Sequence, residues 1–267
     1  MIYNISGNVV SPSAMEEFAD NVAVEHKYDE ITQIEYSIVR VSKIKTDGTE
    51  QYPFVYAPSG TGASKQSALE MNRIKGFCLA MNSGVGASAS GGGYTPLGVL
   101  IQNGVLIQQG SHPNLYQLTI NNNGDLGFQN PNTDGATLIA NGIISALCGF
   151  CPLVIDYDAV DVSYYNWISH YNQKTQRQII GQFGNGDYAI ISSEGRGFDN
   201  SEGCTIEEAI SVCQKNNLKF AFNLDGGGSV ETVIGKKQVN IIYENSAGRA
   251  VPNYIVFNGT NAFKESM

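Results

Sequence analysis

At residues 220–229 the chain reads Phe220-Ala221-Phe222-Asn223-Leu224-Asp225-Gly226-Gly227-Gly228-Ser229. Large apolar side chains alternate with small or polar ones, and this period of two predicts a strand with Asn223 and Asp225 on one face. The three glycines remove every Cβ from the following turn, which permits positive φ angles and a close approach of the backbone to a ligand. The run therefore predicts a strand that ends in an amide and a carboxylate beside a glycine turn, which is an arrangement suited to a binding site.

The same run has a simpler interpretation. Residues 226–228 would also suit a flexible hairpin loop, and Asp225 could merely begin the turn, as aspartate often does. The run alone leaves both interpretations open, so the other motifs of the chain have to decide between them.

The composition is that of a folded, strand-rich protein. The 267 residues can bury a substantial core, 42% of them are hydrophobic, 15% are charged and 30 are glycine, which favours strands and turns over a helical bundle. The formal net charge of -9 argues against binding of nucleic acid, since proteins that bind phosphate backbones gather lysine and arginine. We see no long Pro-rich or Ser-rich linker, so we expect one domain over residues 31–260 after a lead-in or attachment segment over residues 1–30.

The sequence contains no segment typical of membrane insertion or secretion. Its first residues lack a basic stretch followed by an apolar one, and no apolar run approaches the roughly 20 residues of a membrane-spanning helix. We therefore expect a soluble protein with no membrane partner. Its five cysteines are an odd number at irregular spacing, so we expect reduced thiols.

Local patterns predict an α+β protein, a single domain of mixed, mostly antiparallel β-sheets flanked by a few helices. Helices are expected at 13–18, at 64–74 before Gly76, and at 205–216, where Thr205 and Glu208 form a capping box. Residues 86–94 have the composition of a flexible surface loop. Expected strand pairs are 34–42 with 51–57 across Asp47-Gly48, 115–120 with 126–128, and 178–181 with 188–192, with a further strand before Asn103-Gly104.

Several kinds of chemistry lack support in the sequence. Cys148 and Cys151 form a C-x-x-C pair, but no clear amphipathic helix follows it, which favours buried cysteines over a redox site. The three histidines are scattered and none has zinc-binding spacing, and the glycine turn lacks the lysine of a phosphate-binding P-loop. We expect no metal and no cofactor.

Arginines and carboxylates precede the glycine turn in a suggestive order. Arg177, Glu194 and Arg196 come before Asn223 and Asp225. Guanidinium groups bind phosphate with paired donors, and carboxylates act as nucleophile, base or acid. Each arginine alone would equally suit a surface ion pair.

The order of these motifs resembles the phosphodiester glycosidase family, whose members include the enzyme that uncovers mannose 6-phosphate by removing N-acetylglucosamine. The resemblance covers about residues 35 to 257, and its most specific part is the Asn-Leu-Asp-Gly-Gly-Gly-Ser run. The stretches that carry it are Ala80-Met81-Asn82-Ser83-Gly84, Pro96-Leu97-Gly98, Arg177 to Gly181, Glu194-Gly195-Arg196, Gly203-Cys204-Thr205, Asn223 to Ser229, Asn240 and Arg249-Ala250-Val251-Pro252-Asn253.

The resemblance implies hydrolysis of a bond between a sugar anomeric carbon and a phosphodiester. Asp225 would be the catalytic carboxylate and Glu194 its partner in acid or base chemistry. Arg177, Arg196 and Arg249 would bind the phosphate, while Asn82, Asn223 and Ser229 would orient the sugar or phosphate. Gly226 and Gly227 would supply backbone N–H donors.

The resemblance also implies a setting, since some relatives are bacteriophage proteins. We expect either a phage virion protein acting on a cell-surface glycan or a cytoplasmic one, with other virion proteins and a second copy of the chain as candidate partners. The alternative function is a non-catalytic carbohydrate-binding or structural subunit of a phage tail. A third hypothesis is an intracellular hydrolase of a ribosyl-phosphate metabolite.

Overall fold

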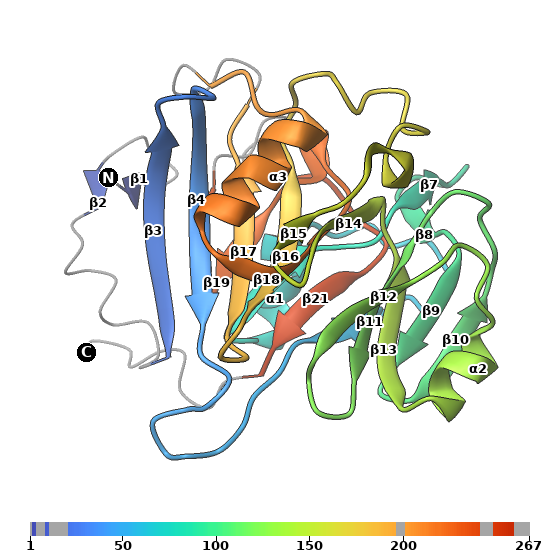
Figure 1. The fold of residues 1–267 in the computed structure, drawn as a ribbon. Helices are drawn as coiled ribbons and strands as arrows, with labels where there is room; N and C mark the ends of the chain where they lie inside the picture. The colour runs from blue at the N-terminus through green and yellow to red at the C-terminus, as the bar shows by residue number, and fades with distance from the viewer. Residues whose placement is uncertain (1, 4–8, 11–20, 196–200, 241–247, 259–267) are drawn as a thin grey trace.

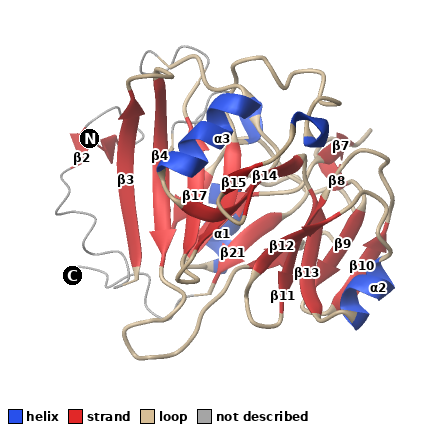
Figure 2. Cartoon of the chain, in the orientation of Figure 1, coloured by secondary structure: helices blue, strands red, loops and turns tan. Residues whose placement is uncertain are grey.

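Most of the chain folds around three β-sheets in the computed structural model, which describes residues 2–3, 9–10, 21–195, 201–240 and 248–258. Strands dominate the chain, and the helices cover its outside (Figures 1 and 2). All strand pairs of the described residues are antiparallel, which confirms the expected α+β class with mostly antiparallel sheets. None of the described helices has the length and apolar character needed to cross a lipid bilayer.

The largest sheet has seven strands in the order β15-β14-β18-β16-β17-β4-β3. Its strands are β3 (Val22–Asp29), β4 (Ile34–Val41), β14 (Cys151–Ile155), β15 (Asp158–Ala159), β16 (Gln178–Phe183), β17 (Tyr188–Ser193) and β18 (Leu218–Asn223). The sheet thus includes residues 22–29, which were expected to belong to the lead-in segment, whereas the helix expected at 13–18 lies outside the described residues.

Two five-stranded sheets pack against one face of the seven-stranded sheet. The first has the order β10-β9-β13-β11-β12 and the second β20-β19-β6-β21-β5. The first comprises β9 (Val99–Gln102), β10 (Val105–Gln109), β11 (Gln117–Asn121), β12 (Leu126–Gln129) and β13 (Ile143–Cys148). The second comprises β5 (Phe54–Tyr56), β6 (Leu79–Asn82), β19 (Thr232–Ile234), β20 (Lys237–Gln238) and β21 (Tyr254–Phe257).

Short elements complete the fold. The helices are α1 (Ala68–Lys75), α2 (Gly135–Ala140) and α3 (Ile206–Lys215), with 3-10 turns η2 (Val162–Tyr164) and η3 (Gly227–Ser229). The two-stranded sheets are β1 (Ile2–Tyr3) with β2 (Val9–Val10), and β7 (Gly86–Ser88) with β8 (Tyr94–Pro96). The segment 86–94 was expected to be a loop. It instead begins with β7 and ends at the start of β8, and these two strands form a hairpin.

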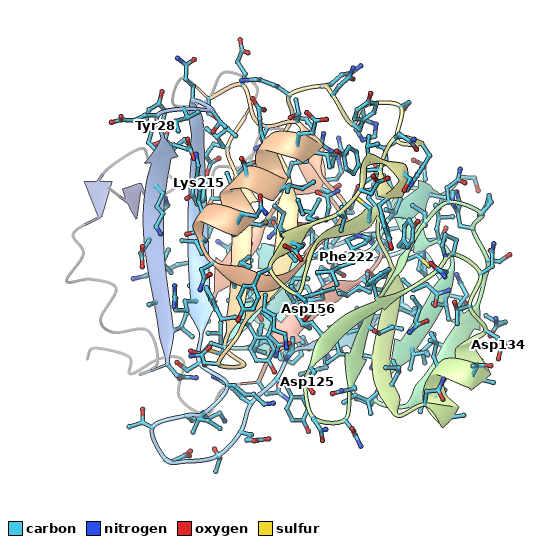
Figure 3. The ribbon with its side chains drawn as sticks, viewed as in Figure 1. Tyr28, Asp125, Asp134, Asp156, Lys215 and Phe222 are labelled. Atoms are coloured by element: carbon cyan, nitrogen blue, oxygen red, sulfur yellow. The ribbon has the colours of Figure 1, made fainter. Side chains whose placement is uncertain are left out.

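The core has a layer on each face of the seven-stranded sheet. Ile180 and Phe222 face the five-stranded sheets, where they pack with Leu100, Leu147 and Ile255. The opposite face is covered by α3 (Figure 1), which buries its apolar stripe mainly against strands β14 and β18. Phe222 is fully buried at the centre of the molecule (Figure 3). Since both faces are covered, the seven-stranded sheet is the rigid layer on which the site is built.

Local signals located most elements but not every pairing. Gly76 ends α1 in the left-handed conformation and the Thr205–Glu208 capping box begins α3, as predicted. The hairpin expected between 34–42 and 51–57 is wrong, because β4 pairs with β3 and β17 while β5 pairs with β21. The turn at Asp47-Gly48 is present, but the strands beyond it belong to different sheets.

Candidate active site

The predicted site lies where the end of β18, an interior strand of the seven-stranded sheet, meets the sheet of β6 and β19. Three backbone hydrogen bonds tie the chain after β18 to both sides: the N–H of Leu224 donates to Gln178, that of Asp225 to Ser83, and that of Gly227 to Gln176, at 2.9–3.0 Å. In an antiparallel sheet the end of β18 lies beside the beginning of β16. Asp225 is therefore held between two sheets by its own backbone.

The Asp225 carboxylate is half-buried and surrounded by donors. The N–H of Gly226 donates to its Oδ1 at 3.0 Å, the hydroxyl of Ser229 donates a further hydrogen bond, and the charge of Arg249 lies close enough to act on it. Burial raises the pKa of Asp225 to about 6, against the opposing effects of Ser229, Gly226 and Arg249. The structure thus brings Asp225, Ser229 and Arg249 together.

The glycine turn needs its glycines for steric reasons. A Cβ on Gly226 would lie 2.8 Å from the carbonyl oxygen of Gln176, and Gly227 has a φ of +59°. The N–H groups of Gly226 and Gly227 donate to Asp225 and Gln176 respectively, so both are used within the protein. The turn shapes the surroundings of Asp225, which differs from the expected direct donation to a ligand.

Asn82 supports Asp225 from behind. Its side chain is fully buried; its Nδ2 donates to the Asp225 carbonyl at 2.8 Å and its Oδ1 accepts from the N–H of Glu231 at 3.0 Å. Both ends of the amide are therefore occupied by backbone groups. Asn82 belongs to the site as a residue that positions the Asp225 backbone, and the expected contact with sugar hydroxyls does not fit this geometry.

Asn223 differs sharply from Asn82. It is fully buried on β18 between Cys151 and Ile179, and neither polar atom of its amide has a hydrogen-bond partner among the described residues. A buried amide without partners costs about 1–3 kcal/mol. Such a group two residues before Asp225 marks the end of β18 as a place where polar contacts are still to be made.

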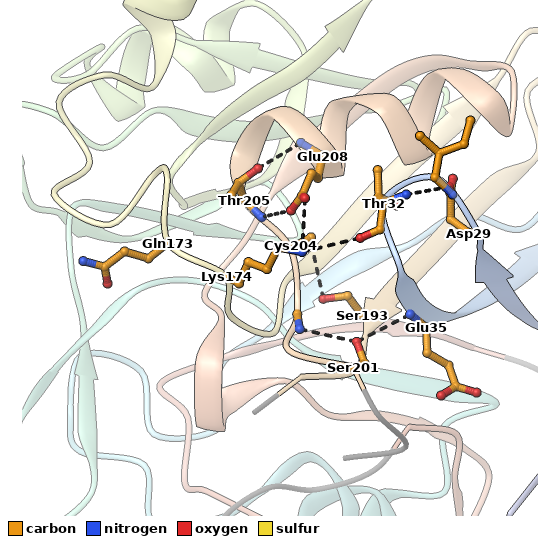
Figure 4. A network of polar contacts seen from close by, with 12 residues as sticks. Asp29, Thr32, Glu35, Gln173, Lys174, Ser193, Ser201, Cys204, Thr205 and Glu208 are labelled. Atoms are coloured by element: carbon orange, nitrogen blue, oxygen red, sulfur yellow. Dashed lines mark hydrogen bonds and ion pairs between the residues drawn. The ribbon is translucent and has the colours of Figure 1, made fainter. Parts of the chain in front are cut away.

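The Arg177 side chain makes its hydrogen bonds to backbone carbonyls and not to Asp225. It is only 1% exposed, its Nε donates to the Cys204 carbonyl at 3.1 Å, and its Nη2 donates to the carbonyls of His170 and Gln173. Nearby, the Cys204 thiol contacts Ser193 and the Ser201 hydroxyl accepts from the N–H of Glu35 (Figure 4). This geometry argues against the expected phosphate contact, because Arg177 fastens the loop at 170–173 to the start of β16.

The two remaining predicted residues follow β17. Glu194 is 4% exposed, and its backbone is tied to Glu35 and Ser201. In the sheet order β17 is separated from β18 by β16, so Glu194 leaves the sheet two strands from Asp225. Arg196 lies outside the described residues.

Sequence reasoning missed a buried carboxylate close to the site. Glu231 is 2% exposed and accepts a hydrogen bond from the N–H of Ala68 at the beginning of α1. Burial raises its pKa to about 7, although hydrogen bonds from the first turn of α1 oppose the shift. A Cβ on Gly248 would lie 2.9 Å from both carboxylate oxygens, so Glu231 packs against the segment that carries Arg249. No local sequence pattern predicts the contacts of Glu231 with Ala68 and Gly248.

The cysteines are buried and free, as expected. Burial raises the pKa of Cys148 to about 11 and that of Cys151 to about 12, so both remain protonated at neutral pH. Within the part of the chain that the structure describes, no group of three or more His, Cys, Asp or Glu side chains could hold a metal ion.

The chain is similar to known proteins in sequence and in fold. A family model described as phosphodiester glycosidase matches residues 75–258. The SPbeta prophage-derived uncharacterized protein YomE of Bacillus subtilis (strain 168) is 26% identical over 237 residues, a match that covers 83% of this chain and 36% of that protein. The chain thus spans about a third of the length of this curated relative.

Solved structures share the fold at low sequence identity. The catalytic domain of zebrafish N-acetylglucosamine-1-phosphodiester alpha-N-acetylglucosaminidase, auto-inhibited by its pro-peptide, is 15% identical with a TM-score of 0.68, over 97% of this chain and 87% of that one. A hypothetical protein from Synechocystis is 13% identical with a TM-score of 0.66, over 89% of this chain and 62% of that one.

Proposed function

This chain belongs to the phosphodiester glycosidase family, and from that premise we propose that it hydrolyses the bond between a sugar anomeric carbon and a phosphate oxygen. The observation that carries the proposal is the half-buried Asp225 carboxylate with Ser229 and Arg249 around it. A phosphodiester is a weakly basic leaving group. Stabilisation of charge can therefore contribute more than protonation of the leaving oxygen.

We assign Asp225 to the sugar side of the reaction. An anomeric carbon that loses a phosphate develops positive charge, and an ionised carboxylate beside it stabilises that charge. The Gly226 N–H and the Ser229 hydroxyl hold the carboxylate in one orientation. Glu194 remains the proposed partner in acid or base chemistry, acting from the end of β17.

Arg249 is the proposed phosphate ligand among the described arginines. It is half-buried and lies close enough to Asp225 to affect its pKa. A guanidinium there would bind the phosphate while Asp225 faces the sugar. Arg196 stays a second proposed ligand from the sequence pattern, and the unpartnered amide of Asn223 is proposed to bind a substrate hydroxyl or phosphate oxygen.

The first substrate to test is a methyl diester of N-acetylglucosamine 1-phosphate, because the name of the zebrafish relative specifies that linkage. Sugar release should be measured for the wild type, for Asp225→Asn and for Asp158→Asn, an exposed carboxylate on β15 that serves as the control. We expect turnover by the wild type and the control and none by Asp225→Asn with its melting temperature retained. Full activity of folded Asp225→Asn would refute the assignment.

The second candidate is a non-catalytic carbohydrate-binding or structural subunit of a phage tail. The prophage origin of the relative and the enclosed position of Arg177 favour it. A panel of sugar-1-phosphate diesters and cell-wall glycopolymers separates the two functions, since saturable binding without product would support the binding subunit. A role on a virion, acting on a cell-surface glycan beside other virion proteins or a second copy of the chain, stays part of either proposal.

A further inference from the structure

A cavity lies at the opposite end of β18 from Asp225. It measures about 480 Å³ and is lined by the beginning of β18, by β12 and by the turns that follow β14 and β16. Phe220 lines this cavity and Asp225 belongs to the candidate active site. Five residues of strand separate them by roughly 16 Å at about 3.3 Å per residue. The cavity is thus distinct from the candidate active site but lies on the same strand.

The floor of the cavity is aromatic. Phe128, Phe183 and Phe220 line it, and the rings of Phe128 and Phe220 are stacked with centroids 6.5 Å apart. Phe220 and Phe183 are nearly buried, whereas Phe128 is half-buried and keeps part of its surface open to the cavity. A pocket with an aromatic floor and a few polar groups is a common form of small-molecule site.

Charged groups of both signs stand at the rim. Asp125 and Asp156 both line the cavity and lie near each other in Figure 3, and their side chains are 51% and 77% exposed. Each is in a long ion pair, Asp125 with Lys43 at 3.6 Å and Asp156 with Lys219 at 3.9 Å. Exposed pairs of this length contribute little to stability, so hydroxyl groups can compete for the carboxylates.

The turn beside the cavity is conformationally strained. Asp156 and Tyr157 have consecutive positive φ angles of +49° and +73° in the tight connection between β14 and β15. Such turns usually contain Asn-Gly, because a large side chain disfavours positive φ. Tyr157 is 45% exposed, and a Cβ on Gly184 would lie 2.1 Å from its hydroxyl. Strain of this kind persists where the surrounding structure enforces it, and here the Tyr157 hydroxyl lies beside Gly184, which lines the cavity.

We propose that this cavity binds a neutral oligosaccharide. The apolar face of a pyranose ring packs on Phe128 and Tyr157, while vicinal hydroxyls donate to Asp125 and Asp156 and accept from Lys219. Two carboxylates and one ammonium group line the cavity, and this balance disfavours an anionic ligand. The site binds glycan independently of any turnover at Asp225.

The test is binding of a neutral N-acetylglucosamine tetramer and a neutral glucose tetramer, measured by calorimetry on the full chain. Asp156→Gly and Tyr157→Gly each remove a side chain while suiting the positive φ, so folding is expected to be retained. Asn132→Gly is the matched control, because Asn132 is another exposed residue with a positive φ (+67°). Asp225→Asn reports on the candidate active site.

We expect at least one tetramer to bind the wild type, Asn132→Gly and Asp225→Asn with equal affinity. Folded Asp156→Gly and Tyr157→Gly should bind it at least tenfold more weakly. The proposal is overturned if neither tetramer binds at millimolar concentration, if both glycine variants bind as the wild type does, or if Asp225→Asn alone abolishes binding. Loss of turnover on the phosphodiester substrate would leave this result unaffected.

Discussion

Opposing effects act on the pKa of the Asp225 carboxyl group. Its surroundings remove water, which favours the neutral acid, while Ser229, Gly226 and Arg249 favour the anion. Burial prevails and brings the pKa to about 6, above its ordinary value of 3.8. A carboxylate with this pKa changes its charge within the range in which many enzymes operate.

The pH profile of the reaction should therefore follow Asp225. If the ionised form stabilises the developing charge, kcat/KM should rise about tenfold per pH unit below the pKa and level off above about pH 6. Initial rates on the methyl diester between pH 4 and 8 would measure this. A rate that falls as pH rises through 6 would instead make Asp225 a proton donor and contradict the assigned role.

The raised pKa of the buried Glu231 should make the free energy of unfolding depend on pH. Its folded-state pKa of about 7 exceeds the ordinary 4.5, so between these values the folded protein holds a proton that the unfolded chain has lost. The free energy of unfolding should consequently fall as pH rises from about 4.5 to about 7 and then level off. At about 1.4 kcal/mol per unit, the loss reaches roughly 3 kcal/mol.

Glu231→Gln removes this titration while keeping an oxygen to accept from Ala68. We expect the variant to be more stable than the wild type at pH 8 by up to about 3 kcal/mol, and to differ little from it below pH 4.5. Urea denaturation at both pH values provides the measurement. Equal stability of the two proteins at pH 8 would show that Glu231 is not buried as an anion.

At the scale of elements, the glycine turn after β18 should tolerate no added methyl group at Gly226. The Cβ of Gly226→Ala would lie 2.8 Å from a backbone oxygen of Gln176, so the turn must shift and take the Asp225 carboxylate with it. Misplacement by about 1 Å can cost on the order of a hundredfold in rate. Gly91→Ala is the control, because nothing lies within 4 Å of its Cβ. A fully active Gly226→Ala enzyme would mean that the turn does not position Asp225.

Elements that neighbouring residues define could be predicted from the sequence, whereas pairings between distant segments could not. The Asn103-Gly104 hairpin, the cap of α3 and the end of α1 at Gly76 follow from neighbouring residues and were predicted. The partners of β4 were not: its pairing with β17 joins segments about 150 residues apart that no local pattern connects, and β3 was missed because residues 1–30 were expected to form a lead-in segment. The glycine turn and Asp225 could be predicted because neighbouring residues define them. The contact between Glu231 and α1 could not, because it joins residues far apart in the sequence.

At the scale of the whole molecule, Arg177 joins three parts of the fold. Arg177 directly precedes β16, and its guanidinium reaches the loop at 170–173 and the Cys204 carbonyl just before α3. From sequence alone an arginine near carboxylates and a glycine turn suggests a phosphate ligand. Only the tertiary structure reveals that backbone carbonyls surround it, and this is why its role differs from the expectation.

Arg177→Met should therefore act on stability and leave substrate affinity unchanged. Methionine fills part of the space but leaves the three carbonyls without their charged donor, which should cost at least about 3 kcal/mol of the free energy of unfolding. Thermal unfolding would measure the loss, and KM determined well below the new melting temperature should match the wild type. A raised KM with an unchanged melting temperature would return Arg177 to the substrate site.

Arg249→Met is the matched comparison. Because Arg249 is a proposed phosphate ligand on a half-buried segment, this variant should raise KM at least tenfold and lower the melting temperature less than Arg177→Met does.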